Sequence, residues 1–316
     1  MSMDALVTNH HSSAMQDEIL AGLSRDDKFI SPKFFYDHHG SELFSEIMEL
    51  PEYYLTRTER KILKDNVYDI AKHVGSDTLL IEPGAGNCEK VTYLLDALRP
   101  HVYYPQDISY EFLSQTAEQL RQQFDWLTVE PISGDFHDEI VLPNSHSQNR
   151  RVVFYPGSTI GNFDPTIAKE FLIRMKKLVA SDGGFIIGVD LHKDSEILND
   201  AYNDNQGVTA KFNLNVLAHI NELLNANFDV AKFAHIAYYN EELRRIEMHL
   251  ESLDTQLVQV ANHTISFTQG ERIHTENSYK YSLSRFRELT HAAGLTLEKT
   301  WMDEQSLFSV HYLTVA

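Results

Sequence analysis

The chain alternates apolar runs of strand length with amphipathic segments of helix length from Thr78 onward, and this alternation limits the fold more than any other feature. Runs such as 185–189 are apolar at consecutive positions, which is typical of strands buried on both faces of a parallel sheet. Parallel neighbours need a crossover between them, so the pattern predicts an α/β domain with a doubly wound sheet. The expected strands are 78–82, 102–104, 127–132, 151–155 and 185–189, and the expected helices are 89–98, 110–124 and 167–179.

Two segments break this alternation. Residues 16–74 have helical periodicity and many aromatic side chains, whereas 233–267 alternates apolar and polar residues as antiparallel strands do. A helix at 284–293 and strands at 295–300 and 308–314 are expected to close the chain. The predicted organisation is an N-terminal helical segment that joins a substrate lobe (16–74), a cofactor-binding core (75–200), a smaller α+β substrate-binding lobe with inserted strands (201–281) and a C-terminal return to the core sheet (282–316).

Composition narrows the classes of partner. The chain has 27 Lys and Arg against 46 Asp and Glu, a formal charge of −19, whereas nucleic acids and anionic membranes attract basic surfaces. Cys88 is the single cysteine, no apolar run approaches the roughly 20 residues of a membrane span, and residues 1–15 do not resemble a signal peptide. We therefore expect a monomeric cytoplasmic protein with a small-molecule partner, and no nucleic-acid or membrane partner.

The sixteen histidines do not follow a metal-binding pattern. His-Glu-x-x-His is missing from the sequence, and His10-His11 and His38-His39 are adjacent pairs rather than pairs four residues apart. The sequence therefore predicts surface and core histidines and no metal site.

A glycine-containing turn follows the first expected strand. Its residues Glu82, Gly84 and Gly86 form an acid-x-Gly-x-Gly pattern that leads into a helix. Glycine permits positive φ and close approach of the backbone to a ligand, and a helix N-terminus offers free N–H groups. The turn predicts a nucleotide-like cofactor, and the missing third glycine disfavours NAD, whose pyrophosphate needs a close cradle.

Acids follow the next two expected strands. Asp107 ends the second strand, where a carboxylate can accept hydrogen bonds from both ribose hydroxyls, and Asp135 and Phe136 follow the third, where they can hold adenine. Carboxyl ends of parallel strands meet along one edge of a sheet, so these residues converge. Their order is that of class I methyltransferases and predicts S-adenosylmethionine as the cofactor; an ordinary turn with solvated acids is the alternative.

Longer motifs resemble one family. The blocks YDHHGSELF at 36–44 and LPEYYLTRTE at 50–59 resemble the histidine-specific Nα-methyltransferase of ergothioneine biosynthesis, and the resemblance continues through YPGSTIGNF at 155–163, AY at 201–202, GVTAKFN at 207–213, RIEM at 245–248 and TENS at 275–278. It implies a Rossmann-like methyltransferase core with a second lobe covering the substrate. It also implies an enzyme that trimethylates the α-amino group of L-histidine to hercynine.

The resemblance also implies roles for single residues. Those expected at the cofactor are Gly84, Lys90, Asp107, Asp135 and Phe136. Those expected at the substrate are Asn162 and Tyr202 for the carboxylate, the catalytic pair Tyr36 and Thr159 with Gly157 around the amine, and Tyr53, Met248, Glu276 and Ser278 around the imidazole.

The expected chemistry is an in-line displacement on the methyl carbon, which needs alignment and a neutral amine but no covalent nucleophile. A buried carboxylate at Glu276 accepts a strong hydrogen bond from an imidazole N–H, which favours histidine over phenylalanine or leucine. Rival functions are methylation of another amine, such as a tryptophan derivative, and a non-catalytic S-adenosylmethionine sensor.

Several site residues also have ordinary structural interpretations. Glu276 has Arg272 or Lys280 as possible ion-pair partners, and Asn162 precedes Asp164-Pro165, where it could cap a helix. Tyr53 and Met248 are of residue types that usually belong to the core. Lys90, one turn into a helix, could be solvated.

Overall fold

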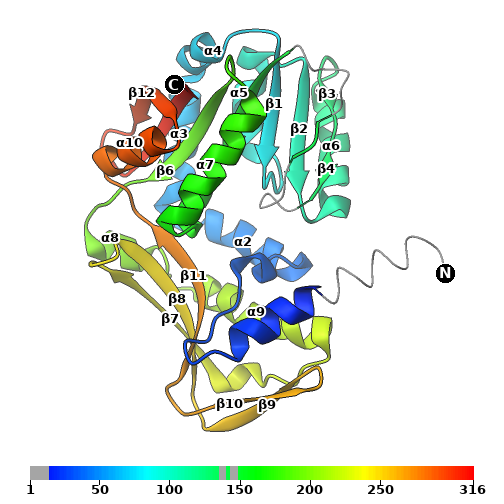
Figure 1. Ribbon diagram of the computed structural model, residues 1–316, viewed down its shortest axis with the longest axis vertical. Coiled ribbons are helices and arrows are strands. Elements are labelled where there is room, and N and C mark those ends of the chain that lie inside the picture. Colours follow the sequence, from blue (N-terminus) through cyan, green and yellow to red (C-terminus); the bar gives the residue numbers. More distant parts are fainter. Residues whose placement is uncertain (1–13, 135–139, 143–148) are drawn as a thin grey trace, which may run out of the picture. The chain divides into compact units, whose positions relative to one another are not determined.

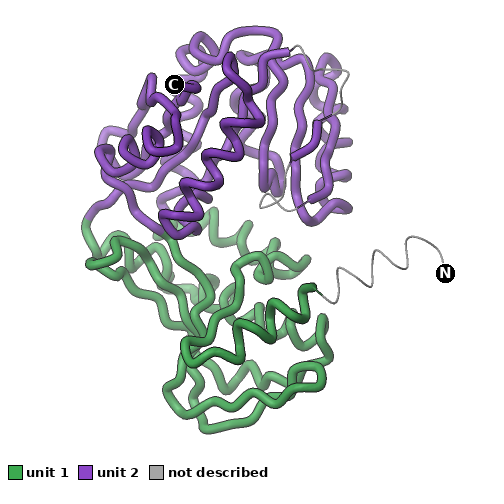
Figure 2. The backbone as a smooth tube through the Cα atoms, in the orientation of Figure 1, with its two compact units in different colours: residues 1–53, 194–278 green, residues 54–193, 279–316 purple. Residues whose placement is uncertain are grey.

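The computed structural model describes residues 14–134, 140–142 and 149–316. Contacts divide the chain into two compact units, which Figure 2 shows in different colours. Unit 1 contains residues 1–53 and 194–278, and unit 2 contains residues 54–193 and 279–316. The chain therefore passes from one unit to the other three times.

Unit 2 is built on one large sheet with the strand order β12-β13-β6-β5-β1-β2-β3, and β4 also pairs with β2. Strands β6, β5, β1, β2 and β3 are parallel, whereas β13 runs antiparallel to both of its neighbours. This confirms the predicted α/β class. The strands are β1 (Thr78–Pro83), β2 (Val102–Asp107), β3 (Thr128–Val129), β4 (Ile132–Ser133), β5 (Arg150–Tyr155), β6 (Gly184–Asp190), β12 (Leu295–Met302) and β13 (Phe308–Val315).

Helices cover both faces of this sheet. On one face, Ile187 and Val189 of β6 belong to an apolar core that includes Phe171 of α7 and Phe286 of α10, and Figure 1 shows α7 lying across the sheet. On the other face, a Cβ atom at Gly188 would meet the side chain of Glu59 from α3. The sheet is therefore doubly wound. Its helices are α3 (Tyr54–Asp65), α4 (Val67–Val74), α5 (Glu89–Leu98), α6 (Tyr110–Gln123), α7 (Pro165–Val179) and α10 (Leu283–Ala292).

The strand order reverses between β1 and β5. From β1 the chain proceeds through β2 to β3 on one side, and β5 leads to β6 on the other. Crossover connections diverge at such a position and leave room at the carboxyl ends of the two strands, where α/β proteins bind their ligands. The turns that follow Pro83 and Tyr155 lie at this position.

One expected strand is wrong. The sequence predicts a single strand over 127–132, but the structure has β3 and β4 as two short strands that pair with different parts of β2. Pro131 lies between them and has no N–H to donate to a neighbouring strand. The ladder is therefore interrupted at the proline.

Unit 1 contains a three-stranded sheet of order β11-β8-β7 and a separate hairpin of β9 and β10. Strands β7 and β8 are antiparallel, as the alternating sequence predicts. Helix α9 packs on β7, β8 and α2. The elements are a helix over 14–23, η1 (Pro32–Phe35), α2 (His38–Met48), α8 (Ser195–Asp200), α9 (Val208–Leu224), η4 (Val230–Lys232), β7 (Phe233–Asn240), β8 (Arg245–Ser252), β9 (Gln256–Val260), β10 (His263–Phe267) and β11 (Arg272–Tyr279).

The units divide the chain at other residues than the ranges expected from the sequence. Helices α3 and α4 belong to unit 2, because α3 packs on β13 and both helices contact α5. Helix α8 belongs to unit 1, where it packs on β7. No helix among the described residues combines the length and the apolar character that crossing a membrane requires.

Candidate active site

The turn after β1 has the backbone conformation that its glycines permit. Gly84 has φ of 68° and Gly86 has φ of 53°, both in the left-handed region. The N–H of Ala85 between them donates to the carbonyl of Gln106 over 2.9 Å, which ties the turn to β2. Among the described residues outside the turn itself, no heavy atom lies within 4 Å of the position that a Cβ atom would take on Gly86, so the backbone here is open to a ligand.

Asp107 lies at the end of the adjacent strand β2 and is oriented by the same turn. Its carboxylate accepts a hydrogen bond from the N–H of Gly86 over 3.0 Å and another from the N–H of Ser109 over 2.9 Å. Each carboxylate oxygen can accept more than one hydrogen bond. The open glycine turn and the fixed, half-buried carboxylate therefore fit an adenosyl group. Asp135 and Phe136, the other expected adenine contacts, lie outside the described residues.

Glu82 lies beneath this turn and is 2% exposed. The hydroxyl of Tyr103 donates a hydrogen bond to its carboxyl group. Burial raises the pKa of Glu82 to about 8, so the group is protonated at neutral pH. Glu82 supports the turn from inside the protein, and its expected contact with the cofactor stays a prediction.

Lys90 in α5 is held by a buried acid rather than being solvated. Its Nζ lies 2.6 Å from Oε2 of Glu59, and its side chain is 15% exposed. Both carboxylate oxygens of Glu59 also accept the N–H of Gly157 over 2.9 Å. Sequence reasoning missed Glu59, although it ends the block at 50–59, and a charged residue on the buried face of a helix was the available signal.

The loop after β5 carries three more expected residues: Gly157, Thr159 and Asn162. Gly157 has φ of 80°, and the hydroxyl of Thr159 donates to the carbonyl of Pro156 over 3.0 Å. Asn162 ends the short helix η3 (Thr159–Asn162). The alternative that Asn162 caps α7 is wrong, because Asp164 occupies the N-cap position.

In unit 1, an aromatic row brings four expected substrate residues together. The ring of Tyr36 packs edge-on against Phe44 at 5.7 Å between centroids, Phe44 against Tyr53 at 6.4 Å, and Tyr53 against Tyr202 at 6.2 Å. The hydroxyl of Tyr202 then donates to Oγ of Ser278 over 2.9 Å. Residues far apart in the sequence thus form one continuous set of rings and hydroxyl groups.

The chain is also similar to a known protein family over nearly its whole length. The family model described as "Histidine-specific methyltransferase, SAM-dependent" matches residues 15–315. The chain belongs to this family. Membership confirms the resemblance in the sequence motifs, the S-adenosylmethionine-dependent histidine methyltransferase activity, the cofactor and a small-molecule substrate.

The relatives of this histidine-specific methyltransferase include two bacterial proteins named histidine N-alpha-methyltransferase. The protein from Mycobacterium tuberculosis (strain CDC 1551 / Oshkosh) is 38% identical over 304 residues, which cover 94% of each chain. The protein from Mycolicibacterium smegmatis is 36% identical over 312 residues, which cover 96% of each chain. A protein of Aspergillus flavus named N-methyltransferase imqF is 28% identical over 303 residues, 92% of this chain and 82% of that protein.

Two strands of the methyltransferase's unit 1 carry the remaining expected residues. Met248 in β8 is 2% exposed, and its carbonyl accepts the hydroxyl of Thr275 over 3.1 Å. Glu276 in β11 is half-buried. Both alternative partners of Glu276 pair with other acids, Arg272 with Glu251 over 2.9 Å and Lys280 with Asp190 over 2.7 Å.

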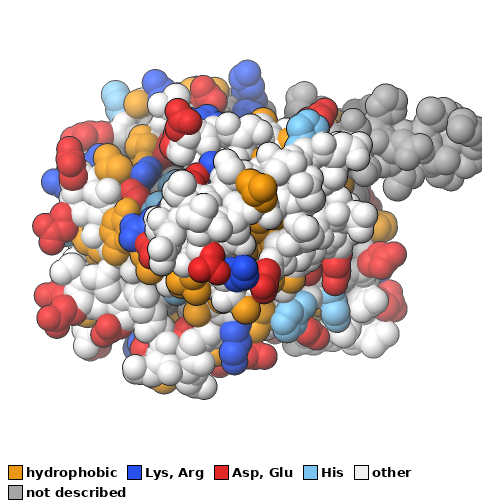
Figure 3. Space-filling view, turned by 90° about the horizontal axis from the view of Figure 1, so that it is seen from below, with side chains coloured by type: hydrophobic (Ala, Val, Ile, Leu, Met, Phe, Trp, Pro, Cys, Tyr) orange, Lys and Arg blue, Asp and Glu red, His pale blue; other side chains and the backbone are white. Residues whose placement is uncertain are grey.

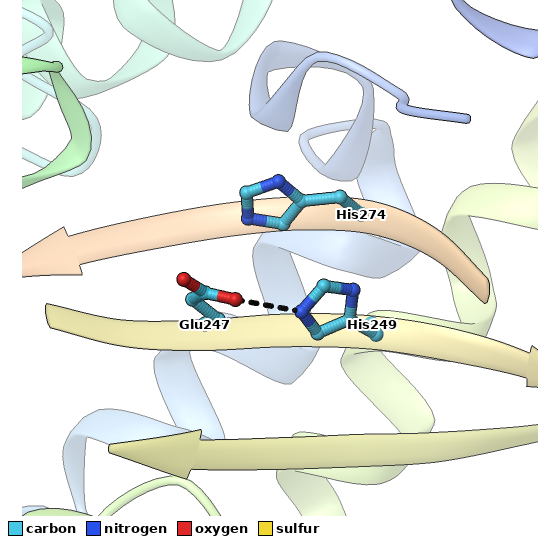
Figure 4. Close-up of side chains that lie close together, drawn as sticks. All are labelled: Glu247, His249 and His274. Atoms are coloured by element: carbon cyan, nitrogen blue, oxygen red, sulfur yellow. Dashed lines mark hydrogen bonds and ion pairs between the residues drawn. The ribbon is translucent and has the colours of Figure 1, made fainter. Parts of the chain in front are cut away.

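A second group of side chains lies on β8 and β11, and Figure 4 shows Glu247, His249 and His274 together. One possible metal-ligand atom from each lies within 4.8 Å of the others. The carboxylate of Glu247, however, accepts hydrogen bonds from Tyr238 over 2.8 Å and Arg245 over 2.8 Å, and its distance to Nε2 of His249 is 3.1 Å.

The two imidazole rings of this group stack at 4.7 Å with 21° between their planes. Ring nitrogens that bind one ion must point toward a common centre, which stacked rings do not do. Burial lowers the pKa of His249 to about 4. Burial favours a raised pKa for Glu247, but the hydrogen bonds from Tyr238, Arg245 and His249 lower it to about 2. We interpret the group as a hydrogen-bonded network on the sheet.

Proposed function

We propose that this methyltransferase transfers three methyl groups from S-adenosylmethionine to the α-amino nitrogen of L-histidine and releases hercynine. The observation that carries the proposal is the row from Tyr36 through Tyr53 and Tyr202 to Ser278. Its rings and hydroxyl groups match the needs of a substrate with an aromatic side chain and polar groups at both ends. A sensor of S-adenosylmethionine alone would not need this second set of residues.

The substrate's carboxylate is assigned to Asn162 and Tyr202. An amide N–H and a phenol O–H are both donors, so together they suit an anion without adding charge of their own; in the complex the Tyr202 hydroxyl would donate to the carboxylate in place of Oγ of Ser278. The N–H group of a substrate imidazole is assigned to Glu276, because a carboxylate accepts a stronger hydrogen bond than a neutral group does. Ser278 serves the second imidazole nitrogen, and Tyr53 and Met248 complete the enclosure.

The amine is assigned to Tyr36, Thr159 and the backbone at Gly157. Bound S-adenosylmethionine supplies a methyl group on a positively charged sulfur. Hydroxyl groups do not stabilise an ammonium ion as a carboxylate would, so this environment favours the neutral amine that attacks. Gly84, Gly86, Lys90, Asp107, Asp135 and Phe136 are assigned to the cofactor, with Glu82 supporting the turn.

We further propose a monomeric cytoplasmic enzyme with no nucleic-acid or membrane partner. Acidic and basic side chains are interspersed over the face of the described residues in Figure 3, and the whole sequence has a formal charge of −19. Neither the interspersed charges nor the net negative charge favours binding to nucleic acids or anionic membranes. Residues 54–193 with 279–316 form the proposed cofactor-binding core, and 14–53 with 194–278 form the proposed substrate lobe.

The test is Glu276→Ala, assayed as kcat/KM for histidine and for tryptophan. Loss of one charge-assisted hydrogen bond should lower the value for histidine about 10- to 100-fold and narrow its advantage over tryptophan. Glu251→Ala is the matched control, because Glu251 is an acid on the neighbouring strand that pairs with Arg272. An unchanged ratio of kcat/KM for histidine to kcat/KM for tryptophan in Glu276→Ala would show that Glu276 does not recognise the substrate's side chain.

A further inference from the structure

Glu59 connects two parts of unit 2 that the proposed function assigns to different ligands. Its side chain is 1% exposed and reaches from α3 to Lys90 of α5 and to the loop after β5. The Nζ of Lys90 lies 2.6 Å from Oε2, and the N–H of Gly157 donates to both oxygens over 2.9 Å. One carboxylate therefore holds an expected cofactor residue and an expected substrate residue.

The surroundings are shaped for this carboxylate. A Cβ atom at Gly188 of β6 would lie 2.0 Å from Oε1 of Glu59, so only glycine leaves room for it. A Cβ atom at Gly157 would lie 3.2 Å from Nζ of Lys90, and the φ of +80° also disfavours a side chain at Gly157. Gly188 thus leaves room for the carboxylate of Glu59, and Gly157 leaves room for the Lys90 side chain that binds it.

The charges at this position depend on each other. A carboxylate this deeply buried needs a cation and hydrogen-bond donors to offset its lost hydration. An ammonium group has three donors, so Lys90 can bind Glu59 and still donate to a ligand. Lys90 and Glu59 also both act on the pKa of Glu82, which places the pair within electrostatic range of the cofactor turn.

We propose that Glu59 is a positioning residue that makes the binding of cofactor and of substrate interdependent, because it fixes Lys90 and the amide of Gly157 through one carboxylate. The inference rests on the proposed function, which places the cofactor at Lys90 and the substrate amine at Gly157. A ligand that fixes Lys90 or the amide of Gly157 also fixes the Glu59 carboxylate, and with it the second of these two contacts. Coupling of this kind is reciprocal between the two ligands.

The experiment is calorimetric titration of the full chain with S-adenosylhomocysteine, in the absence of histidine and at saturating histidine. The ratio of the two dissociation constants is the coupling factor. In Glu59→Gln the amide keeps the size of the side chain but loses the charge that holds Lys90. We expect about 10-fold weaker binding of S-adenosylhomocysteine, and a coupling factor closer to 1 than in the wild type.

The control is Arg60→Gln. Arg60 pairs with Glu89 over 2.8 Å between the same two helices, α3 and α5, but this pair does not include Gly157. A variant that only loosened the packing of these helices would resemble Arg60→Gln. Glu59→Gln with the coupling factor and affinity of Arg60→Gln would overturn the proposal, even if its melting temperature were lower.

Gly188→Ala is a second variant that keeps every polar group and displaces the Glu59 carboxylate. It should reduce the coupling factor as Glu59→Gln does, and an unchanged factor would contradict the proposal if Glu59→Gln does not fold. Failure of the proposed function has a different signature. Histidine would then leave the affinity of the wild type for S-adenosylhomocysteine unchanged. In that case, weaker S-adenosylhomocysteine binding by Glu59→Gln than by Arg60→Gln would still show that Glu59 positions Lys90 at the cofactor.

Discussion

Asp107 is the side chain on which the proposed cofactor site depends most. Its carboxylate already accepts the N–H groups of Gly86 and Ser109, so its orientation is set before any ligand binds. A preorganised acceptor loses little entropy when the ligand's hydroxyl groups bind to it. The same two hydrogen bonds also make Asp107 part of the turn itself.

We expect Asp107→Ala to weaken the binding of S-adenosylhomocysteine by roughly 2 to 3 kcal/mol, the cost of losing charge-assisted hydrogen bonds. Isothermal titration measures this directly. Asp96→Ala, which removes an exposed acid paired with Arg99, should bind as the wild type does. Unchanged affinity in Asp107→Ala would remove Asp107 from the site.

Glu82 gives a prediction about stability and pH. Burial raises its folded-state pKa from 4.5 to about 8, so the folded chain binds a proton that the unfolded chain releases. The stability from this proton is fully present below pH 4.5 and is lost as pH rises through about 8. Between these limits the free energy of unfolding should fall with pH, by on the order of 3 to 5 kcal/mol from this group.

Glu82→Gln cannot release this proton and should remove that part of the pH dependence. Urea unfolding of both proteins between pH 5 and pH 8.5 measures the difference, and Glu118→Gln, at an exposed acid, controls for lost surface charge. Parallel pH curves for wild type and Glu82→Gln would mean that Glu82 is ionised in the folded protein at neutral pH.

The positions of some proposed site residues could be predicted from the sequence, and those of others required the fold. Asp107 follows from its position at a strand end, which an apolar run identifies. Glu59 does not, because its partners Lys90 and Gly157 come from other elements. The choice between the alternative ion-pair partners of Glu276 likewise required the fold. Arg272 and Lys280 are near Glu276 in sequence, but Arg272 pairs with Glu251 and Lys280 pairs with Asp190.

At the scale of the elements, a buried ion cluster fastens the ends of several of them in unit 2. Asp190 ends β6 and is 0% exposed. Its carboxylate lies 2.6 Å from Nζ of Lys193 and 2.7 Å from Nζ of Lys280, and it accepts the hydroxyl of Tyr54 over 2.8 Å. Tyr54, Lys193 and Lys280 each lie at or next to a point where the chain changes unit.

Asp190→Asn should therefore destabilise the protein by about 3 to 5 kcal/mol, because two lysines would remain buried without their counter-charge. The free energy of unfolding in urea measures this. The control is Asp65→Asn at the exposed pair with Lys61, for which we expect less than about 0.5 kcal/mol. If Asp190→Asn changed the free energy of unfolding as little as the control does, solvent would be stabilising the two lysine charges in place of Asp190.

The core elements were largely predictable because their apolar runs are buried on both faces. The bounds of α5 agree with the expected 89–98, and β1, β5 and β6 extend the expected strands by one or two residues. The error at β3 and β4 came from Pro131, which does not interrupt an apolar pattern but does interrupt hydrogen bonding. The apolar pattern of a segment predicts its burial more reliably than it predicts which strands pair.

At the scale of the whole molecule, each unit is assembled from separate stretches of sequence. Residues 1–53 join 194–278, and 54–193 join 279–316. The sequence does not give these limits, because the helical periodicity of 16–74 continues from α2 through α3 although the two helices belong to different units. Which unit a helix joins depends on the surface that covers its apolar face, and this is a tertiary property.

The proposed site residues are likewise divided between the units: the cofactor residues belong to unit 2, and the row from Tyr36 to Ser278 belongs to unit 1. The proposed function assigns both sets to one reaction, methylation of histidine at its α-amino nitrogen. The most direct measurement is the identity of the product when the full chain is incubated with L-histidine and excess S-adenosylmethionine, determined by mass spectrometry and NMR, with S-adenosylhomocysteine quantified in parallel and histamine tested alongside.

The predicted result is histidine trimethylated at the α-amino nitrogen, three molecules of S-adenosylhomocysteine for each product molecule, and little methylation of histamine, which lacks the carboxylate assigned to Asn162 and Tyr202. Methyl groups on the imidazole nitrogens, equal methylation of histamine, or methylation of tryptophan in preference to histidine would contradict the proposed function.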